Sequence, residues 1–159
     1  MVGFVGRLWT TAALGTLAAL GWLLAIAPVM ASDFRSVAEG GAILYDGPSL
    51  KARGLFVATA YLPVELIASD GKWNKVRDPS GDLAWVEATA LSTQRTVMAV
   101  QSVVSVRQSP SDKSTELCKV VQGVALDYAD QSGVPPGWVK VRHRDGLTGF
   151  VRISQVWGT

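Results

Sequence analysis

A hairpin-like stretch occurs twice in this chain and constrains its fold more than any other feature. The segment WNKVRDPSGDLAWV (residues 73–86) returns as WVKVRHRDGLTGFV (residues 138–151), without a gap, at a spacing of 65 residues. Upstream the match continues at a spacing of 62, pairing Pro48 with Pro110, Ser49 with Ser111 and Leu55 with Leu117. One three-residue insertion in a loop reconciles the two spacings, and loops tolerate insertions. The sequence therefore predicts two copies of one unit, at residues 33–92 and 95–159.

Each copy consists of short β-rich runs separated by turn residues. The turn DPSG (residues 78–81) has the Asp, Pro and Gly positions of a type I turn. Its counterpart RDG (residues 144–146) carries the Asp-Gly pair typical of hairpins. Turn signals about every 8–12 residues favour a small barrel or sandwich, and beyond the N-terminal segment no window keeps a helical apolar period. The predicted fold class is all-β, with two small barrels in tandem.

Residues 1–31 indicate a targeting segment that precedes both units. Arg7 is followed by an uncharged run at residues 8–27, and the small-residue exit VMA ends at residue 31. This layout is typical of a secretory signal peptide, although the run is also long enough to be an uncleaved membrane anchor. We expect an exported, periplasmic protein, which is anchored in the inner membrane through residues 1–31 if that segment is not cleaved.

The charge and cysteine content narrow the possible partners. Lys and Arg number 15 and Asp and Glu number 13, for a net charge of +2. Because a nucleic-acid binder should present a strongly basic face, no nucleic-acid partner is predicted. Cys118 is the only cysteine, so no internal disulfide can form. It aligns with Phe56, which predicts an apolar packing position for its thiol.

The repeated segments resemble the bacterial SH3 (Src homology 3) domains. The resemblance rests on GKWNKVRDPSGDLAWV and PGWVKVRHRDGLTGFV, each with a Trp-x-Lys-Val strand, a tight turn and a returning aromatic-Val strand. The Pro-Ser pairs at residues 48–49 and 110–111 resemble the Pro-Ser element before the second strand of that family. The resemblance implies two partly open barrels in an exported protein. It also implies binding to a peptide, an envelope protein or peptidoglycan.

Strand alternation predicts one ligand face in each copy. Successive side chains point to opposite sides of a strand, which places Trp73, Lys75 and Arg77 together, opposite Val76. The second copy places together Trp138, Lys140 and Arg142. We interpret Val76 and its copy Val141 as core residues, as we do Val86 and Val151. A Trp beside cations can stack on a ligand, but each Trp could instead pack against a neighbouring loop or the other barrel.

Tyr45 extends the predicted face of the first copy only. The resemblance implies a groove formed by the Trp at the start of this strand and Tyr residues of the first loop, where Tyr45 lies. The aligned residue of the second copy is Arg107, so a second aromatic groove is not expected there. On the return strands, we expect Trp85 and Phe150 in the core.

The remaining polar residues do not predict catalysis. His143 is the only histidine, and a metal site needs more nitrogen or sulfur ligands than it and Cys118 provide. We therefore predict a non-catalytic binding module without metal or cofactor. The alternative is an envelope scaffold protein whose barrels pack on each other. An enzyme would require His143 and several carboxylates to converge in a deep pocket.

A basic group on the second hairpin leaves one question open. The group comprises Lys140, Arg142, Arg144 and Arg152. Such a group is usually a solvated face, and a specific site for an anionic partner is the alternative.

Overall fold

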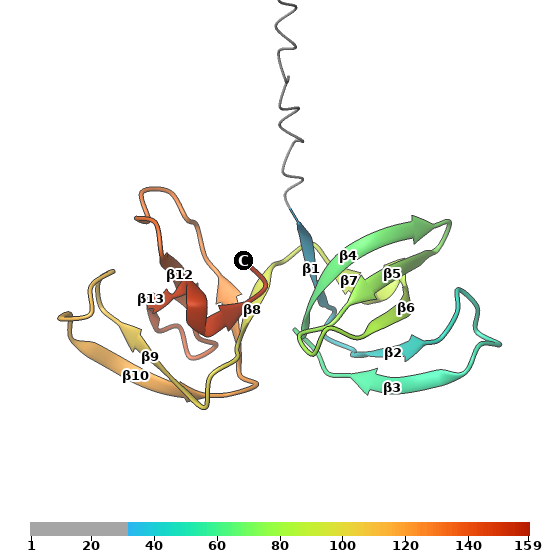
Figure 1. The fold of residues 1–159 in the computed structure, drawn as a ribbon, viewed down its shortest axis with the longest axis horizontal. Coiled ribbons are helices and arrows are strands. Elements are labelled where there is room, and N and C mark those ends of the chain that lie inside the picture. Colours follow the sequence, from blue (N-terminus) through green and yellow to red (C-terminus); the bar gives the residue numbers. More distant parts are fainter. Residues whose placement is uncertain (1–31) are drawn as a thin grey trace, which may run out of the picture. The chain divides into compact units, whose positions relative to one another are not determined.

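The computed structural model describes residues 32–159, and the predicted signal peptide or anchor lies outside them. The described residues form two antiparallel sheets of seven strands each, one from each copy of the repeat (Figure 1). Within this part of the chain, no helix is long and apolar enough to cross a membrane.

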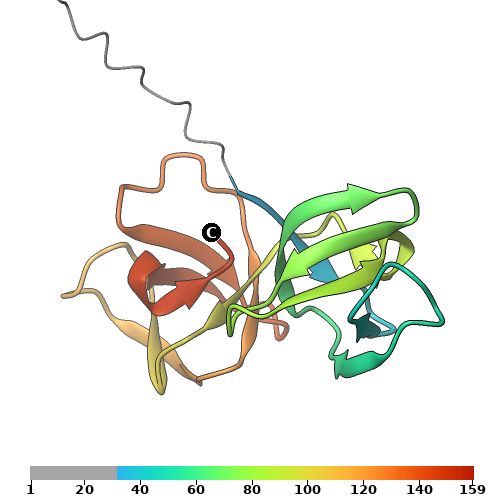
Figure 2. The same cartoon turned by 45° about the vertical axis from the view of Figure 1, so that its right-hand side comes forward.

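The first sheet has the spatial order β3-β2-β6-β5-β4-β1-β7. Its strands are β1 (Asp33–Val37), β2 (Ala42–Tyr45), β3 (Gly54–Ala58), β4 (Pro63–Asp70), β5 (Trp73–Arg77), β6 (Leu83–Glu87) and β7 (Leu91–Ser92). A single 3-10 turn, η1 (Ala88–Ala90), precedes β7. Figure 2 shows the meander of β4, β5 and β6 in green.

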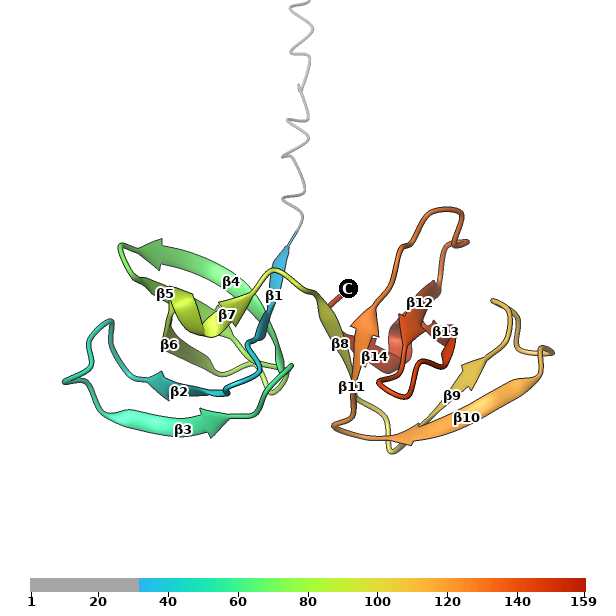
Figure 3. The same cartoon turned by 180° about the vertical axis from the view of Figure 1, so that it is seen from behind.

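The second sheet has the order β10-β9-β13-β12-β11-β8-β14, which repeats the order of the first sheet. Its strands are β8 (Thr96–Ala99), β9 (Val103–Arg107), β10 (Glu116–Val121), β11 (Ala125–Tyr128), β12 (Trp138–Arg142), β13 (Thr148–Arg152) and β14 (Val156–Trp157), with η2 (Ile153–Gln155) before β14. β8 lies between β11 and β14 (Figure 3). The identical order confirms the predicted duplicated all-β fold.

Each barrel encloses its own apolar core. In the first barrel Val76 and Val86 are fully buried, and in the second Val141 and Val151 are buried equally. These four valines confirm the core positions predicted from alternation. Fully burying a side chain of this size stabilises the fold by about 1.5–3 kcal/mol. Since the two clusters share no residue, each copy is stabilised by its own set of core contacts.

Trp85 and Phe150 lie outside the core, contrary to the prediction. The buried residues of β6 are Ala84 and Val86, and Trp85 between them points to the outer face, half-buried. Phe150 takes the same position on β13. Residues directly opposite on antiparallel strands share a face. Trp85 is opposite Lys75, which belongs to the outer face. The Trp85 side chain must therefore lie on the outer face and not in the core.

The two hairpin turns reach one geometry with different residues. The Gly81 N–H donates to the Asp78 carbonyl at 3.0 Å, and the Gly146 N–H donates to the His143 carbonyl at 2.9 Å. Both glycines have φ of +94°, a left-handed value that favours Gly over other residues. In the first turn the Asp78 carboxylate also accepts the Asp82 N–H at 2.9 Å. The turn residues are replaceable because the Gly supplies the required backbone conformation.

Contacts between the copies involve β1 and the loop before β4 in the first, and β8, β14 and the hairpin turn in the second. The Thr96 hydroxyl donates to the Tyr61 carbonyl at 2.7 Å, and Phe34 meets Trp157 edge-to-face at 5.0 Å between ring centroids. The Arg144 guanidinium stacks 3.9 Å from the Tyr61 ring centroid. These contacts use aromatic residues other than the Trp that opens each hairpin.

Candidate functional site

The first barrel gathers three aromatic side chains on its outer face. Tyr45 on β2 is the register partner of Trp85 on β6, and Trp73 starts the next strand, β5. The Tyr45 and Trp73 rings meet edge-to-face, with centroids 5.4 Å apart and planes at 90°. All three side chains are half-buried. The face thus combines Tyr45 and Trp73, as predicted, with Trp85, which was expected in the core.

Lys75 adds a cation to this aromatic cluster. Its Cα is the register partner of Trp85, so the two side chains share the outer face. Tyr and Trp present an apolar ring together with a hydrogen-bonding O–H or N–H group. A ligand on this face would therefore meet flat apolar surface, three hydrogen-bonding groups (one O–H and two N–H) and one positive charge. We call Tyr45, Trp73, Lys75 and Trp85 the aromatic face.

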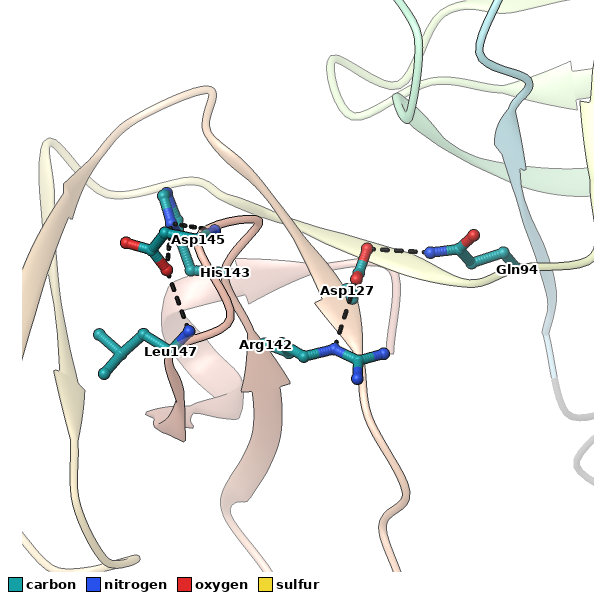
Figure 4. Close-up of polar contacts among 6 residues, drawn as sticks. All are labelled: Gln94, Asp127, Arg142, His143, Asp145 and Leu147. Atoms are coloured by element: carbon teal, nitrogen blue, oxygen red, sulfur yellow. Dashed lines mark hydrogen bonds and ion pairs between the residues drawn. The ribbon is translucent and has the colours of Figure 1, made fainter.

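Arg77 and Arg142 lie apart from the Trp residues with which they were grouped. Each is four residues further along its strand, about 13 Å at the usual rise. Arg77 forms an ion pair with Glu65 at 2.8 Å, and Arg142 forms one with Asp127 at 3.7 Å. Figure 4 shows the second pair, where the Gln94 amide also donates to Asp127 at 3.1 Å. These arginines therefore join neighbouring strands and do not extend the aromatic face.

The second barrel covers its equivalent Trp. Trp138 is only 8% exposed, and the Arg152 guanidinium lies 4.2 Å from its ring centroid. Arg152 is also the register partner of Trp138. Its Nε donates to Asp112 Oδ1 at 3.1 Å, and its Nη2 donates to Asp112 Oδ2. We call this stacked ion pair the Arg152 clamp.

The Arg152 clamp shifts the pKa values of both Asp112 and Arg152. The hydrogen bond from Arg152 holds the pKa of Asp112 below its ordinary value, and the same bond raises the pKa of Arg152. Asp112 comes from the loop between β9 and β10, far from Arg152 in sequence. The clamp therefore joins the loop between β9 and β10 to Arg152 at the end of β13.

The residues around the two Trp side chains have diverged. At the 62-residue spacing, Leu50 and Tyr45 of the first copy align with Asp112 and Arg107 of the second. At the 65-residue spacing, the aligned pairs are Trp85 with Phe150 and Glu87 with Arg152. The second face thus keeps Lys140, the partner of Phe150, and adds two arginines. The sequence placed Arg152 in a basic group with Lys140, and Arg107 only opposite Tyr45 in the alignment; the change from Glu87 to Arg152 was the available signal that Arg152 differs from its counterpart.

His143 and Asp145 form a local pair in the second hairpin turn. His143 Nδ1 lies 3.0 Å from Asp145 Oδ1, and the Leu147 N–H donates to the same carboxylate at 3.0 Å (Figure 4). The Leu147 bond, with help from His143, lowers the pKa of Asp145. A cavity of about 280 Å³ is lined in part by His143 and Arg144, and its lining residues include no carboxylate. Over residues 32–159, no cluster of His, Cys, Asp and Glu has the composition of a metal site.

Cys118 packs against the second core, as its alignment with Phe56 predicts. Its side chain is half-buried. Burial raises the pKa of the thiol, so the protonated form prevails at neutral pH and nucleophilic reactivity is low.

Comparison with known proteins also gives two domains in tandem. A family model described as bacterial SH3 domain matches residues 38–93, and a second model with the same description matches residues 102–156. None of the curated proteins compared with the chain matches it.

Solved structures similar to this chain include NlpC2 and NlpC1 from Trichomonas vaginalis. NlpC2 is 13% identical with a TM-score of 0.36, over 81% of this chain and 49% of its own. NlpC1 is 15% identical with a TM-score of 0.37, over 92% of this chain and 52% of its own. The chain therefore spans about half the length of either protein. The repeated strand order and the two family matches together show that the chain belongs to the bacterial SH3 domain family, with two such domains in tandem.

Proposed function

We propose that this protein is a non-catalytic, exported binding module whose aromatic face holds a peptide, an envelope protein or a peptidoglycan component. The carrying observation is the cluster of Tyr45, Trp73 and Trp85 beside Lys75 on the outside of the first barrel. Flat aromatic rings with one open side are typical anchors at binding surfaces, because they bury large apolar area at low entropic cost. The proposed location is the periplasm, or the inner membrane if residues 1–31 remain attached.

The environments of His143 and Cys118, both in the second barrel, support binding without catalysis. His143 is paired with Asp145 within its own turn, and the nearby cavity has no carboxylate in its lining. Cys118 has a raised thiol pKa. A general base or an activated nucleophile requires a neighbouring group in hydrogen-bond reach of the reacting atom.

A pull-down with purified peptidoglycan and with envelope extract tests the proposal. The wild-type protein should be enriched, and Trp73→Ala should weaken binding by about tenfold or more, as for a central aromatic anchor. Leu83→Ala is the matched control, because it truncates an exposed apolar side chain on β6 at the end away from Trp73. Equal enrichment of folded wild type and Trp73→Ala would show that the aromatic face is not the binding site.

A scaffold role is the second candidate, favoured by the contacts between the barrels. The hydrogen bond from Thr96 to Tyr61 and the Phe34–Trp157 ring contact join the two copies. A scaffold protein would keep its envelope association after Trp73→Ala and would lose it when Phe34→Ala and Trp157→Ala are combined. The same pull-down therefore separates the two roles.

A further inference from the structure

We infer that the second barrel binds an acidic residue of a peptide, whose carboxylate pairs with Arg152 over Trp138 in the place that Asp112 occupies in the free protein. The inference deepens the proposed function, on which it rests, by giving the second barrel a ligand chemistry different from that of the first.

The Arg152 clamp is itself a carboxylate complex. The guanidinium offers two N–H donors to the two oxygens of Asp112, the planar pairing that makes Arg the preferred partner of carboxylates. Its flat face rests on the Trp138 ring, at 4.2 Å. A ring below the guanidinium fixes its plane and leaves its N–H edge available. Asp112 thus shows which chemical group this position accepts.

The surrounding charges favour an acidic ligand. Arg107 on β9 and Lys140 on β12 are both register partners of Phe150, so they share the outer face with Arg152. Arg107 donates one N–H to the Ser114 carbonyl at 2.8 Å, which holds it at this loop. Glu116 lies opposite Arg107 and Asp130 lies near Lys140, so it is Arg152 that lacks a carboxylate once Asp112 leaves, and its positive charge then attracts the acidic ligand. In the first barrel, Glu87 stands where Arg152 stands and would repel the same ligand.

Asp112 lies where a ligand carboxylate can displace it from Arg152. Its side chain is 64% exposed and lies on a surface loop, where an ion pair contributes little net free energy because water competes for both charges. An incoming carboxylate restores the pairing of Arg152, and the rest of the peptide can contact the half-buried Phe150 on the same face. The exchange therefore leaves no charge buried without a partner, since the Asp112 carboxylate is hydrated when it moves into water.

Titration with short peptides tests the inference, with the indole N–H resonance of Trp138 as the readout. The probe is N-acetylated, C-amidated Ala-Glu-Ala-Glu-Ala, and its Gln counterpart has the same shape without charge. A third peptide is the Gln sequence with a free C-terminal carboxylate. We expect the Glu peptide to shift the Trp138 resonance and the Gln amide to leave it unchanged.

Variants identify the residues responsible. Asp112→Asn should tighten binding of the Glu peptide about three- to tenfold, because it removes the internal competitor. Arg152→Gln should abolish binding and Arg152→Lys should weaken it, because Lys lacks the two-pronged donor. Arg142→Gln, the matched control, removes one charge from a strand of the same barrel and should leave affinity unchanged.

Three results would overturn the inference. The first is equal binding of the Glu and Gln amides, and the second is an unchanged affinity of folded Asp112→Asn for the Glu peptide. The third is binding of only the peptide with the free C-terminal carboxylate, and not of the Glu amide. The last would assign the position to a chain terminus instead of an acidic side chain. The titration does not involve Trp73. Equal enrichment of wild type and Trp73→Ala in the pull-down would therefore refute only the proposed function, and a titration without binding would refute only the inference about Arg152.

Discussion

The two barrels share strand order, core valines and a Trp at the start of the central hairpin. They differ in whether the ring of that Trp is accessible or covered. In the first barrel Trp73 is half-buried beside Tyr45 and belongs to an aromatic face. In the second, Trp138 is buried beneath Arg152. The difference shows that the inner face of the sheet preserved the fold while the outer face diverged in chemistry.

The largest expected difference between the barrels lies at an aligned position of the return strand. A Cβ on Gly149 would lie 2.6 Å from Val106 Cγ1 and 2.7 Å from the Arg107 carbonyl oxygen. The first barrel has Ala84 there, buried without such a conflict. We predict that Gly149→Ala lowers the free energy of unfolding by about 1–3 kcal/mol, as overpacking does. Denaturant unfolding measures the change.

Ala84→Gly is the matched control for that substitution. It should cost about 1 kcal/mol, since it removes one methyl group and adds backbone freedom. A neutral Gly149→Ala would contradict the account, because the aligned positions would then be equivalent.

Moving the Arg152 clamp to the first barrel should close the aromatic face. Leu50→Asp with Glu87→Arg places the clamp residues around Trp73, at the aligned positions. We expect lower accessibility of Trp73 to a soluble quencher and a gain in stability of no more than about 1 kcal/mol, because the new ion pair is exposed. Each single substitution lacks a partner and serves as the control. Unchanged accessibility in the double variant would mean that the loops, and not the charges, determine the difference.

Acid should open the second barrel's face and leave the first unaffected. The pKa of Asp112 is lowered in the folded protein, so its pairing favours the folded, clamped state above the ordinary value of 3.8 and this contribution is lost as the pH falls through the lowered value. We predict that the Trp138 indole resonance moves below about pH 3.8 while that of Trp73 does not. Asp112→Asn should abolish this movement. Parallel movement of both resonances would indicate general acid unfolding.

The smallest predicted effect concerns the outer side of the β2–β3 ribbon. Val57 is 72% exposed and Ile43 47%, whereas the aligned residues of the second barrel are Lys119 and Ser105, both in contact with Glu116. Val57→Lys should change stability by less than about 0.5 kcal/mol, as surface substitutions do, and should lower binding of an apolar fluorescent dye. Lys119→Val should increase dye binding. Equal dye binding by both variants would show that this side is not a distinguishing apolar surface.

The fold was predictable because it depends on patterns repeated in the sequence. The two spacings located the copies, and alternation around Val76 and Val86 identified core positions. The same alternation places Trp85 outside the core once Val86 is inside, so expecting it in the core was inconsistent with the neighbouring assignment. Alternation placed Trp73 and Lys75 on one face, and the family resemblance added Tyr45, whose ring meets that of Trp73; ligand binding by these residues stays a prediction.

The Arg152 clamp could not be predicted in the same way. Asp112 and Arg152 are 40 residues apart in sequence, and their meeting depends on the path of the loop between β9 and β10. Arg77 and Arg142 share the strand parity of the Trp residues, but carboxylates of the neighbouring strands pair with them. Parity assigns a face, whereas cross-strand partners decide what a side chain on that face contacts.

The most direct test of the difference between the barrels is the solvent accessibility of the two Trp rings. Protein labelled with 5-fluorotryptophan can be titrated with a soluble gadolinium chelate, with resonances assigned by Trp73→Phe and Trp138→Phe. We predict strong broadening of the Trp73 resonance and weak broadening of the Trp138 resonance, and we expect the Trp138 broadening to increase in Asp112→Asn. Equal broadening of the two resonances, or a Trp138 resonance that does not respond to Asp112→Asn, would contradict this prediction.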